Sequence, residues 1–306
     1  MYDSLLVPLD GSQAAAQVLP YVRFLARGLD CRVILVTVAE PPLEDVGPSS
    51  PTRATPAKTE SAEADYLDRV AATFEDSRLV ASTEVIEGRA AESIIAYAEA
   101  HRPGLIVMAT YGRSGPGVWV LGGVADRVIS ASATPVLLLR PGAQERPVRQ
   151  PELRSIIVPL DGSRLAEAAL PHAEALASKL SMDIVLTRAV ERPRLFESAS
   201  PSTTGPASVP APTVAEATNA VEREAQDYLD RWTSALLVKG LRARWELRHG
   251  PPAGEIVRLA GSLAGSIVAM TTHGRSGVGR WLLGSITNKV VRACDRPILL
   301  VHPEAG

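Results

Sequence analysis

The hexapeptide Val7-Pro8-Leu9-Asp10-Gly11-Ser12 recurs unchanged as Val158-Pro159-Leu160-Asp161-Gly162-Ser163 in this chain of 306 residues. A second stretch, TYGRSG at residues 110–115, is matched by THGRSG at residues 272–277. Two matched stretches in the same order indicate an internal duplication. The first match is shifted from residue 7 to 158, by 151 residues, and the second from 110 to 272, by 162 residues. The second copy therefore carries an insertion between the two stretches.

The duplication predicts two domains, at residues 1–142 and 153–306, joined by a linker at residues 143–152. Composition agrees, since the chain is about twice the typical ~150 residues of a domain. With 46% apolar and 22% charged residues, it has the profile of a soluble globular protein.

The charge balance and the apolar runs exclude several classes of protein. A net charge of -2 argues against a nucleic-acid binder, which carries a basic excess. No apolar run approaches the ~20 residues of a membrane span, and the N-terminus lacks the basic region of a signal peptide. The two cysteines, Cys31 and Cys294, have neither disulfide nor metal-site spacing. These features together predict a cytoplasmic protein with no nucleic-acid or membrane partner.

Short apolar runs alternate with helical stretches in each copy, which predicts an α/β fold with a parallel sheet covered by helices on both faces. In the first copy, strands are expected at residues 4–9, 33–38, 79–87, 105–109 and 136–139, and helices at residues 14–28, 61–76, 90–101 and 124–131. In the second copy, strands are expected at residues 155–160, 184–189, 242–248, 266–270 and 298–301, with a long helix at residues 213–239.

The repeated motifs begin where predicted strands end, which is where open parallel sheets bind ligands. A glycine-rich loop that leads into a helix presents backbone N–H groups and the positive end of the helix dipole to an anion. Phosphate is the expected ligand, with Asp10 or Asp161 placed to bond a ribose hydroxyl. The competing interpretation is that the glycines only form turns and that the two aspartates only cap the first helix of each copy.

The standard catalytic and nucleotide-binding signatures do not fit this sequence. Gly279 and Gly284 have P-loop spacing, but the phosphate-binding lysine is missing. There is no nucleophile elbow, and the five histidines form no ligand spacing. We therefore assign no catalytic residue and no protein metal site, and we expect no fast enzymatic activity.

A longer glycine pattern points to a known family. After the strand predicted at residues 266–270 of the second copy, the chain reads Thr271-Thr272-His273-Gly274, then nine residues, then Gly284-Ser285. The first copy reads Ala109-Thr110-Tyr111-Gly112, then nine residues, then Gly122-Gly123. This pattern resembles the G-x-x-G, nine residues, G-(S/T) motif of the ATP-binding members of the universal stress protein family. The resemblance covers both copies, so the chain resembles the tandem two-domain form.

The resemblance implies a Rossmann-like, doubly wound sheet of five parallel strands in each domain, with strand order 3-2-1-4-5. It further implies that the last strands of the two domains pair, so that one chain forms a pseudo-dimer. ATP, with Mg²⁺ as a companion ion, is the implied ligand, and a stress-response regulator is the implied role. An adenine nucleotide and an unidentified protein are the implied partners, and a homodimer is compatible with the resemblance.

The implied nucleotide contacts fall on matched positions of the two copies. In the second copy they are Asp161, Ala189, Met270, Thr271, Gly274, Gly277, Gly284 and Ser285. In the first copy they are Asp10, Val38, Met108, Gly112, Gly115, Gly122 and Gly123.

Two departures from the motif distinguish this chain. Ala109 and Thr271 stand where the motif has its first glycine, so a Cβ there is expected to crowd the nucleotide, or to strain the loop if positive φ is required. Ser285 offers a hydroxyl group where Gly123 offers only its N–H, which makes the second copy the better site. The alternative function is a tandem scaffold that binds protein partners without a nucleotide.

Overall fold

The computed structural model describes residues 1–40, 56–75, 79, 81–112, 121–142, 151–191, 214–272 and 283–303. The first half contains β1 (Ser4–Pro8), α1 (Gln13–Ala16), α2 (Leu19–Leu29), β2 (Arg32–Ala39), α3 (Pro56–Glu75), β3 (Ala81–Glu87), α4 (Ala90–His101), β4 (Leu105–Ala109), α5 (Gly123–Ala131) and β5 (Val136–Leu139). The second half contains β6 (Ser155–Pro159), α6 (Arg164–Glu167), α7 (Leu170–Leu180), β7 (Asp183–Val190), α8 (Val214–Val238), β8 (Ala243–His249), α9 (Pro252–Ser262), β9 (Ser266–Thr271), α10 (Ser285–Ala293) and β10 (Ile298–Val301).

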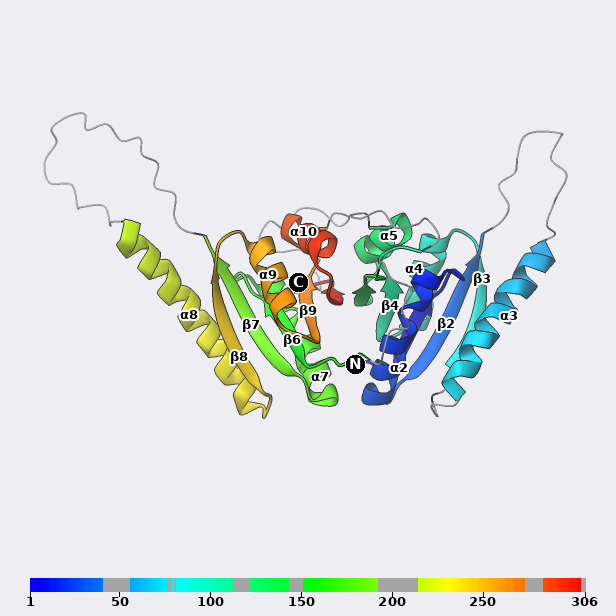
Figure 1. Cartoon of the computed structure of the whole chain (residues 1–306), viewed down its shortest axis with the longest axis horizontal. Coiled ribbons are helices and arrows are strands. Elements are labelled where there is room, and N and C mark those ends of the chain that lie inside the picture. The colour runs from blue at the N-terminus through cyan, green and yellow to red at the C-terminus, as the bar shows by residue number, and fades with distance from the viewer. Residues whose placement is uncertain are drawn as a thin grey trace, which may run out of the picture.

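The ten strands in the described part of the chain form one sheet in the order β3-β2-β1-β4-β5-β10-β9-β6-β7-β8. Within each half the neighbouring strands are parallel, as in the pairing of β1 with both β2 and β4. The halves meet at an antiparallel pair, β5 with β10, in which Leu137 lies opposite Leu299. The predicted strand order 3-2-1-4-5 and the pairing of the last strands are thus confirmed. Figure 1 shows the two halves side by side, with α3 and α8 at the outer ends.

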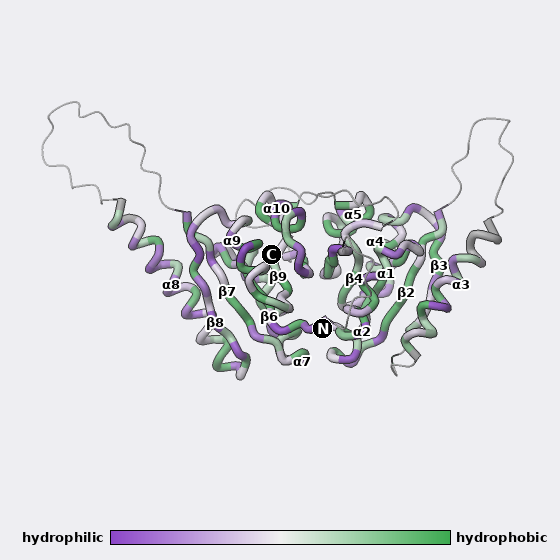
Figure 2. The backbone as a smooth tube through the Cα atoms, viewed as in Figure 1, coloured by the Kyte–Doolittle hydropathy of each residue, from purple (hydrophilic) through white to green (hydrophobic). Residues whose placement is uncertain are grey.

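Helices cover both faces of the sheet, and each face has its own hydrophobic core. One core joins the strands to α2, α3, α7 and α8 through residues such as Leu25, Leu67 and Leu229. The other joins them to α4, α5, α9 and α10 through residues such as Ile94 and Val290. Figure 2 shows the central strands mostly green, whereas α3 and α8 alternate between green and purple along their length. That alternation is typical of helices with one buried face.

The helix predicted at residues 14–28 is wrong in one respect, because the structure has two helices there, α1 and α2. Pro20 lies in the first turn of α2, where a missing N–H group costs nothing. In a continuous helix, Pro20 would fail to bond the carbonyl of Ala16 and would clash with it. Pro171 separates α6 from α7 in the same way.

Side chains also connect the halves. The Tyr2 hydroxyl, from the first half, is 2.9 Å from Nδ1 of His172 on α7. Arg140, after β5, donates to the carbonyl oxygen of Val291 at the end of α10. None of the helices in the described part of the chain combines the length and apolar character needed to cross a bilayer.

Candidate functional site

Each half has a cavity at the carboxyl ends of its central strands. The first cavity, of about 410 Å³, lies where β1 and β4 end and α5 begins. The second cavity, of about 430 Å³, lies at the equivalent place beside β6, β9 and α10. In each half the chain reverses its winding direction between these two strands. Both cavities therefore occupy the position where doubly wound sheets bind ligands.

The Asp-Gly-Ser turn forms one wall of each cavity. In the second half, Oδ1 of Asp161 accepts hydrogen bonds from the backbone N–H and the hydroxyl of Ser163, at 2.9 and 2.6 Å. The Ser163 hydroxyl in turn accepts from the backbone N–H of Ala166, so Ser163 is the N-cap of α6. Gly162 has φ of 85°, a left-handed conformation that favours glycine. The same bonds recur around Asp10 and Ser12.

These contacts test whether the aspartates cap the first helix of each half. The N-cap residue is Ser12 in the first half and Ser163 in the second, and the aspartate accepts hydrogen bonds from that serine. The interpretation that Asp10 and Asp161 only cap the helix is therefore wrong. Both aspartates line the cavities.

The opposite wall is the beginning of a helix. Gly284 is the N-cap of α10 and Gly122 is the N-cap of α5, and neither helix has a side-chain cap bond. The N–H of Gly284 donates to the carbonyl of Thr272 at 2.7 Å, and that of Gly122 donates to Thr110 at 2.8 Å. These bonds hold the loop end, and the first-turn residues of both helices line the cavities, which is an arrangement suited to an anion.

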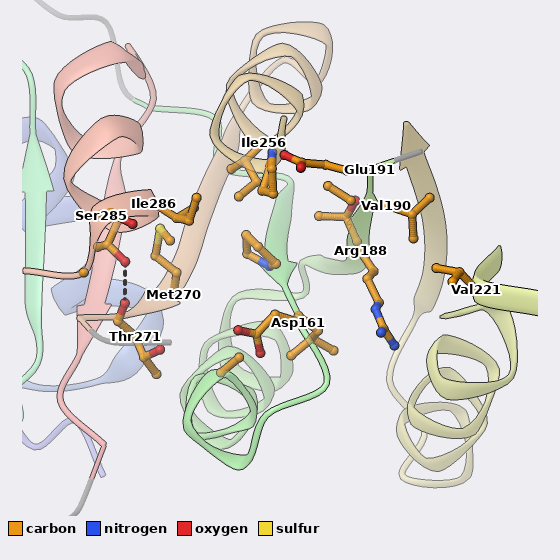
Figure 3. A pocket seen from close by; sticks show the side chains of 18 residues that line it. Asp161, Arg188, Val190, Glu191, Val221, Ile256, Met270, Thr271, Ser285 and Ile286 are labelled. Atoms are coloured by element: carbon orange, nitrogen blue, oxygen red, sulfur yellow. Dashed lines mark hydrogen bonds between the residues drawn. The ribbon is translucent and has the colours of Figure 1, made fainter. Parts of the chain in front are cut away.

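The structure brings the described members of the predicted contact set together. Those that line the second cavity are Asp161, Ala189, Met270, Thr271, Gly284 and Ser285. Those that line the first cavity are Asp10, Val38, Met108, Gly112, Gly122 and Gly123. Figure 3 shows Met270, Thr271 and Ser285 on one side of the second cavity and Arg188, Val190 and Val221 on the other, with Asp161 between them. The remaining predicted contacts, Gly115, Gly274 and Gly277, lie outside the described residues.

The strain expected at the first motif position is absent. Ala109 and Thr271 are the last residues of β4 and β9, and neither is among the described residues with positive φ. Both have extended backbone that any residue adopts. The carbonyl of Thr271 also accepts a hydrogen bond from the Thr287 hydroxyl at 2.9 Å, which ties β9 to the first turn of α10.

A polar cluster beside the second cavity escaped the sequence analysis. Arg188, on β7, is only 7% exposed and lies 3.3 Å from a carboxylate oxygen of Glu224. Its guanidinium also stacks over the Tyr228 ring, at 5.4 Å from the centroid. The Tyr228 hydroxyl donates to Glu167 at 2.8 Å, and Trp232 donates to the same oxygen at 3.3 Å. Burial raises the pKa of Tyr228, and the hydrogen bond to the Glu167 carboxylate raises it further.

One signal in the sequence locates part of this cluster. The pentapeptide DYLDR occurs at residues 65–69 and again at residues 227–231, so Tyr228 belongs to a third repeated motif. Arg188 and Glu167 carry no such signal, because Thr37 and Ala16 stand at their places in the first half.

The polar groups on the cavity walls are mainly carboxylates, hydroxyl groups and backbone groups. Among the described residues that line them, none is histidine, cysteine or lysine. No described group of three or more histidine, cysteine or acidic side chains has the geometry to hold a metal ion. The arrangement is suited to hold a ligand with one hydroxyl-rich part near the aspartate and one anionic part near the helix N-terminus.

Comparison with known proteins agrees with this architecture. The model of the universal stress protein family matches residues 1–140 and again residues 152–302. The universal stress protein MJ0531 of Methanocaldococcus jannaschii is 30% identical over 148 residues, which is 48% of this chain and 81% of that protein. YxiE of Bacillus subtilis, also a universal stress protein, is 29% identical over 147 residues, 48% of this chain and 97% of its own length.

A solved structure extends the likeness to the whole chain. A universal stress protein from Archaeoglobus fulgidus aligns with a TM-score of 0.68, covering 98% of this chain and 96% of that one, at 17% identity. At that identity the likeness concerns the fold alone. Because the family model accounts for both halves, the chain belongs to the universal stress protein family, with two family domains in tandem.

Proposed function

We propose that this protein binds an adenine nucleotide, ATP in particular, in the second cavity, and that it acts as a stress-response regulator rather than as a fast enzyme. One observation carries the proposal: Asp161, Met270 and the adjacent pair Gly284 and Ser285 come from three separate segments of the sequence but line one cavity. Its volume of about 430 Å³ is that of a small-molecule site.

The walls suggest how the nucleotide lies. Apolar side chains, including Met270 and Ile256, suit the adenine ring, and the backbone of Ala189 offers it hydrogen-bonding groups. Asp161 is placed to accept hydrogen bonds from the ribose hydroxyl groups, because a carboxylate is a good acceptor. The N-terminus of α10 and the Ser285 hydroxyl are placed for the phosphates, because N–H groups and the helix dipole favour negative charge there.

A magnesium ion fits this site only as a companion of the nucleotide. Mg²⁺ commonly takes one or two carboxylates, with substrate phosphates and water as its other ligands. The described residues contain no three-residue metal cluster, and Asp161 is the carboxylate of the Asp-Gly-Ser turn. We propose that any Mg²⁺ binds mainly through the phosphates.

The lining residues support the proposal of slow or absent turnover. A general base must lie within hydrogen-bond reach of the attacking group. The described lining of the second cavity holds no histidine, cysteine or lysine, and Oδ1 of its Asp161 already accepts two hydrogen bonds from Ser163.

The test is nucleotide content. Purified protein is denatured, and the released adenine nucleotide is quantified per chain by chromatography. We expect roughly one ATP per chain in the wild type, and at least about a ten-fold loss in Gly284→Leu, because Gly284 lines the phosphate end of the cavity and leucine there changes the shape of that wall. Gly261→Leu is the matched control, because Gly261 is exposed on α9 and a Cβ there meets no atom within 4 Å.

The outcomes separate the proposal from its rival. If Gly284→Leu retains wild-type ATP content while its circular dichroism is unchanged, the second cavity is not the nucleotide site. If the wild type releases no nucleotide and titration with ATP and Mg²⁺ also gives no binding, the tandem scaffold becomes the better interpretation.

A further inference from the structure

The two cavities have similar volumes and matching walls, but their charges differ. The described lining of the first cavity includes three carboxylates, Asp10, Glu40 and Glu63, and no basic side chain. The described lining of the second includes two carboxylates, Asp161 and Glu191, and one guanidinium, that of Arg188. A ligand with several negative charges therefore meets a more negative wall in the first cavity than in the second.

Glu63 accounts for one part of the difference. It lies on α3 two residues before the DYLDR pentapeptide, and Ala225 holds the same place on α8. Ala225 is fully buried and does not line the second cavity, whereas Glu63 lines the first. The two long helices thus present different chemistry from equivalent positions.

Arg188 accounts for the second part. Thr37 holds its place in the first half, where the hydroxyl donates to the carbonyl of Leu9 at 3.0 Å. The Arg188 side chain is 8% exposed, while its partner Glu224 is 68% exposed. Water screens the exposed carboxylate more than the buried guanidinium, so the pair leaves net positive character on the wall that lies across the cavity from Ser285 (Figure 3).

The phosphate end differs in the same direction. Asp126 is exposed in the first turn of α5, next to the lining residue Ala125, and Asn288 holds its place in α10. Both backbone N–H groups donate to the N-cap carbonyl, at 2.9 Å to Gly122 and 2.8 Å to Gly284, so the two positions are equivalent. A carboxylate in the first turn already occupies part of the favourable field of the helix dipole and repels a second anion.

From these differences we infer that the two cavities select adenine ligands of different charge. The second cavity takes the triphosphate, and the first takes an adenine ligand with less charge, adenosine or its monophosphate. Glu63 and Asp126 are the residues that set the preference of the first cavity. This inference rests on the proposed function, since it assigns ligands to the same pair of sites.

The experiment isolates one cavity at a time. Gly284→Leu alters the second cavity and Gly122→Leu the first, because both residues are helix N-caps that line the phosphate end. A Cβ on Gly122 comes within 3.1 Å of the Thr110 carbonyl oxygen, so leucine there must displace the wall that the loop end forms. Each full-length variant is titrated by calorimetry with ATP, AMP and adenosine at one fixed salt concentration. We expect the Gly284→Leu chain to bind adenosine or AMP at least about ten-fold more tightly than ATP, and the Gly122→Leu chain to show the opposite order.

Exchange of residues between the halves tests the cause. In the Gly284→Leu background, Glu63→Ala with Asp126→Asn copies the second half, and we expect ATP affinity to rise about ten-fold with adenosine affinity unchanged. Glu99→Gln is the control for removal of a charge, because Glu99 is exposed in the last turn of α4, whereas Asp126 lies in the first turn of α5, whose N-terminal residues line the cavity. It should leave the ratio of ATP to adenosine affinity as it was.

Three results would overturn the inference. The first is ATP binding in the Gly284→Leu chain as tight as that of adenosine, and the second is an affinity ratio that the exchange does not change. The third is a Gly284→Leu chain that binds none of the three ligands while the wild type binds ATP. By contrast, a wild-type chain that binds no adenine ligand at all refutes the proposed function, and this inference with it.

Discussion

At the scale of single residues, the phosphate ends of the two cavities differ at Gly123, because Ser285 stands at the same place in the second half and adds a side-chain hydroxyl group. A Cβ built on Gly123 meets no atom within 4 Å, so serine fits without displacing a neighbour. We expect Gly123→Ser to tighten AMP binding in the first cavity about five-fold, the effect of one hydrogen bond of ~1 kcal/mol. The free energy of unfolding should rise by about 0.5 kcal/mol, because serine favours a helix more than glycine does.

Calorimetric titration and urea denaturation check these two effects separately. Gly261→Ser is the matched control, because it places serine at another open and exposed helix position far along the chain. It should gain stability without gaining affinity. Equal affinity changes in the two variants would mean that the Gly123→Ser hydroxyl does not contact the ligand.

The residues that could be predicted from the sequence are those that both halves share. Asp161 and Gly284 stand in repeated motifs at strand ends, and chain topology alone then requires them to meet. Arg188 and Glu63 are not repeated in the other half of the chain, and they lie on a strand and a helix outside the repeated motifs. Their role at the cavities depends on which face of β7 and α3 turns toward the ligand, and this is fixed only by packing.

At the scale of elements, one hydrogen-bonded cluster fastens α8 to α6. The Tyr228 hydroxyl donates to Glu167 at 2.8 Å across 61 residues of sequence. We expect Tyr228→Phe to reduce the free energy of unfolding at neutral pH by about 1.5 kcal/mol, the value of a hydrogen bond to a charged group. Chemical denaturation followed by circular dichroism measures this loss.

The same cluster predicts how stability depends on alkaline pH. Burial and the Glu167 carboxylate raise the pKa of Tyr228 above its unfolded value. The folded state therefore holds the phenol proton more tightly, so this contribution is complete below pH ~10 and is lost as pH rises beyond it. We expect this group to lower the wild-type free energy of unfolding by up to ~1.4 kcal/mol per pH unit in that range, and Tyr228→Phe to show a shallower slope. Identical slopes would show that Tyr228 ionises as readily in the folded chain as in the unfolded one.

Helices and strands were predicted well where the apolar pattern runs without interruption, and poorly where a proline breaks the backbone inside such a pattern. The predicted bounds of α4 and of β4, β5 and β10 match the structure residue for residue. The single helix expected after β1 is two helices, because the apolar spacing continues across Pro20 although the backbone cannot. Hydropathy periodicity reports which face is buried and does not report a change of helix axis.

At the scale of the whole molecule, the junction between the halves is part of the core rather than a contact between separate domains. Each hydrophobic core contains residues of both halves, such as Leu137 and Leu299 on one face. The sheet is also continuous through the β5–β10 pair. The family resemblance implied this pairing, whereas periodicity alone identifies two similar sheets without saying which edges join.

A continuous core predicts that the two halves unfold together. Leu299 is fully buried and lies opposite Leu137 in the antiparallel pair. We expect Leu299→Ala to lower the free energy of unfolding of the whole chain by about 2–5 kcal/mol, through lost burial and the cavity left behind. Because both cores cross the junction, circular dichroism and tryptophan fluorescence should follow one urea transition, in the wild type and in the variant.

Leu237→Ala, at a position 52% exposed on α8, is the control and should change the free energy of unfolding by less than about 0.5 kcal/mol. Two separated transitions, with Leu299→Ala shifting only one of them, would show that the halves are independent folding units joined at a weak edge.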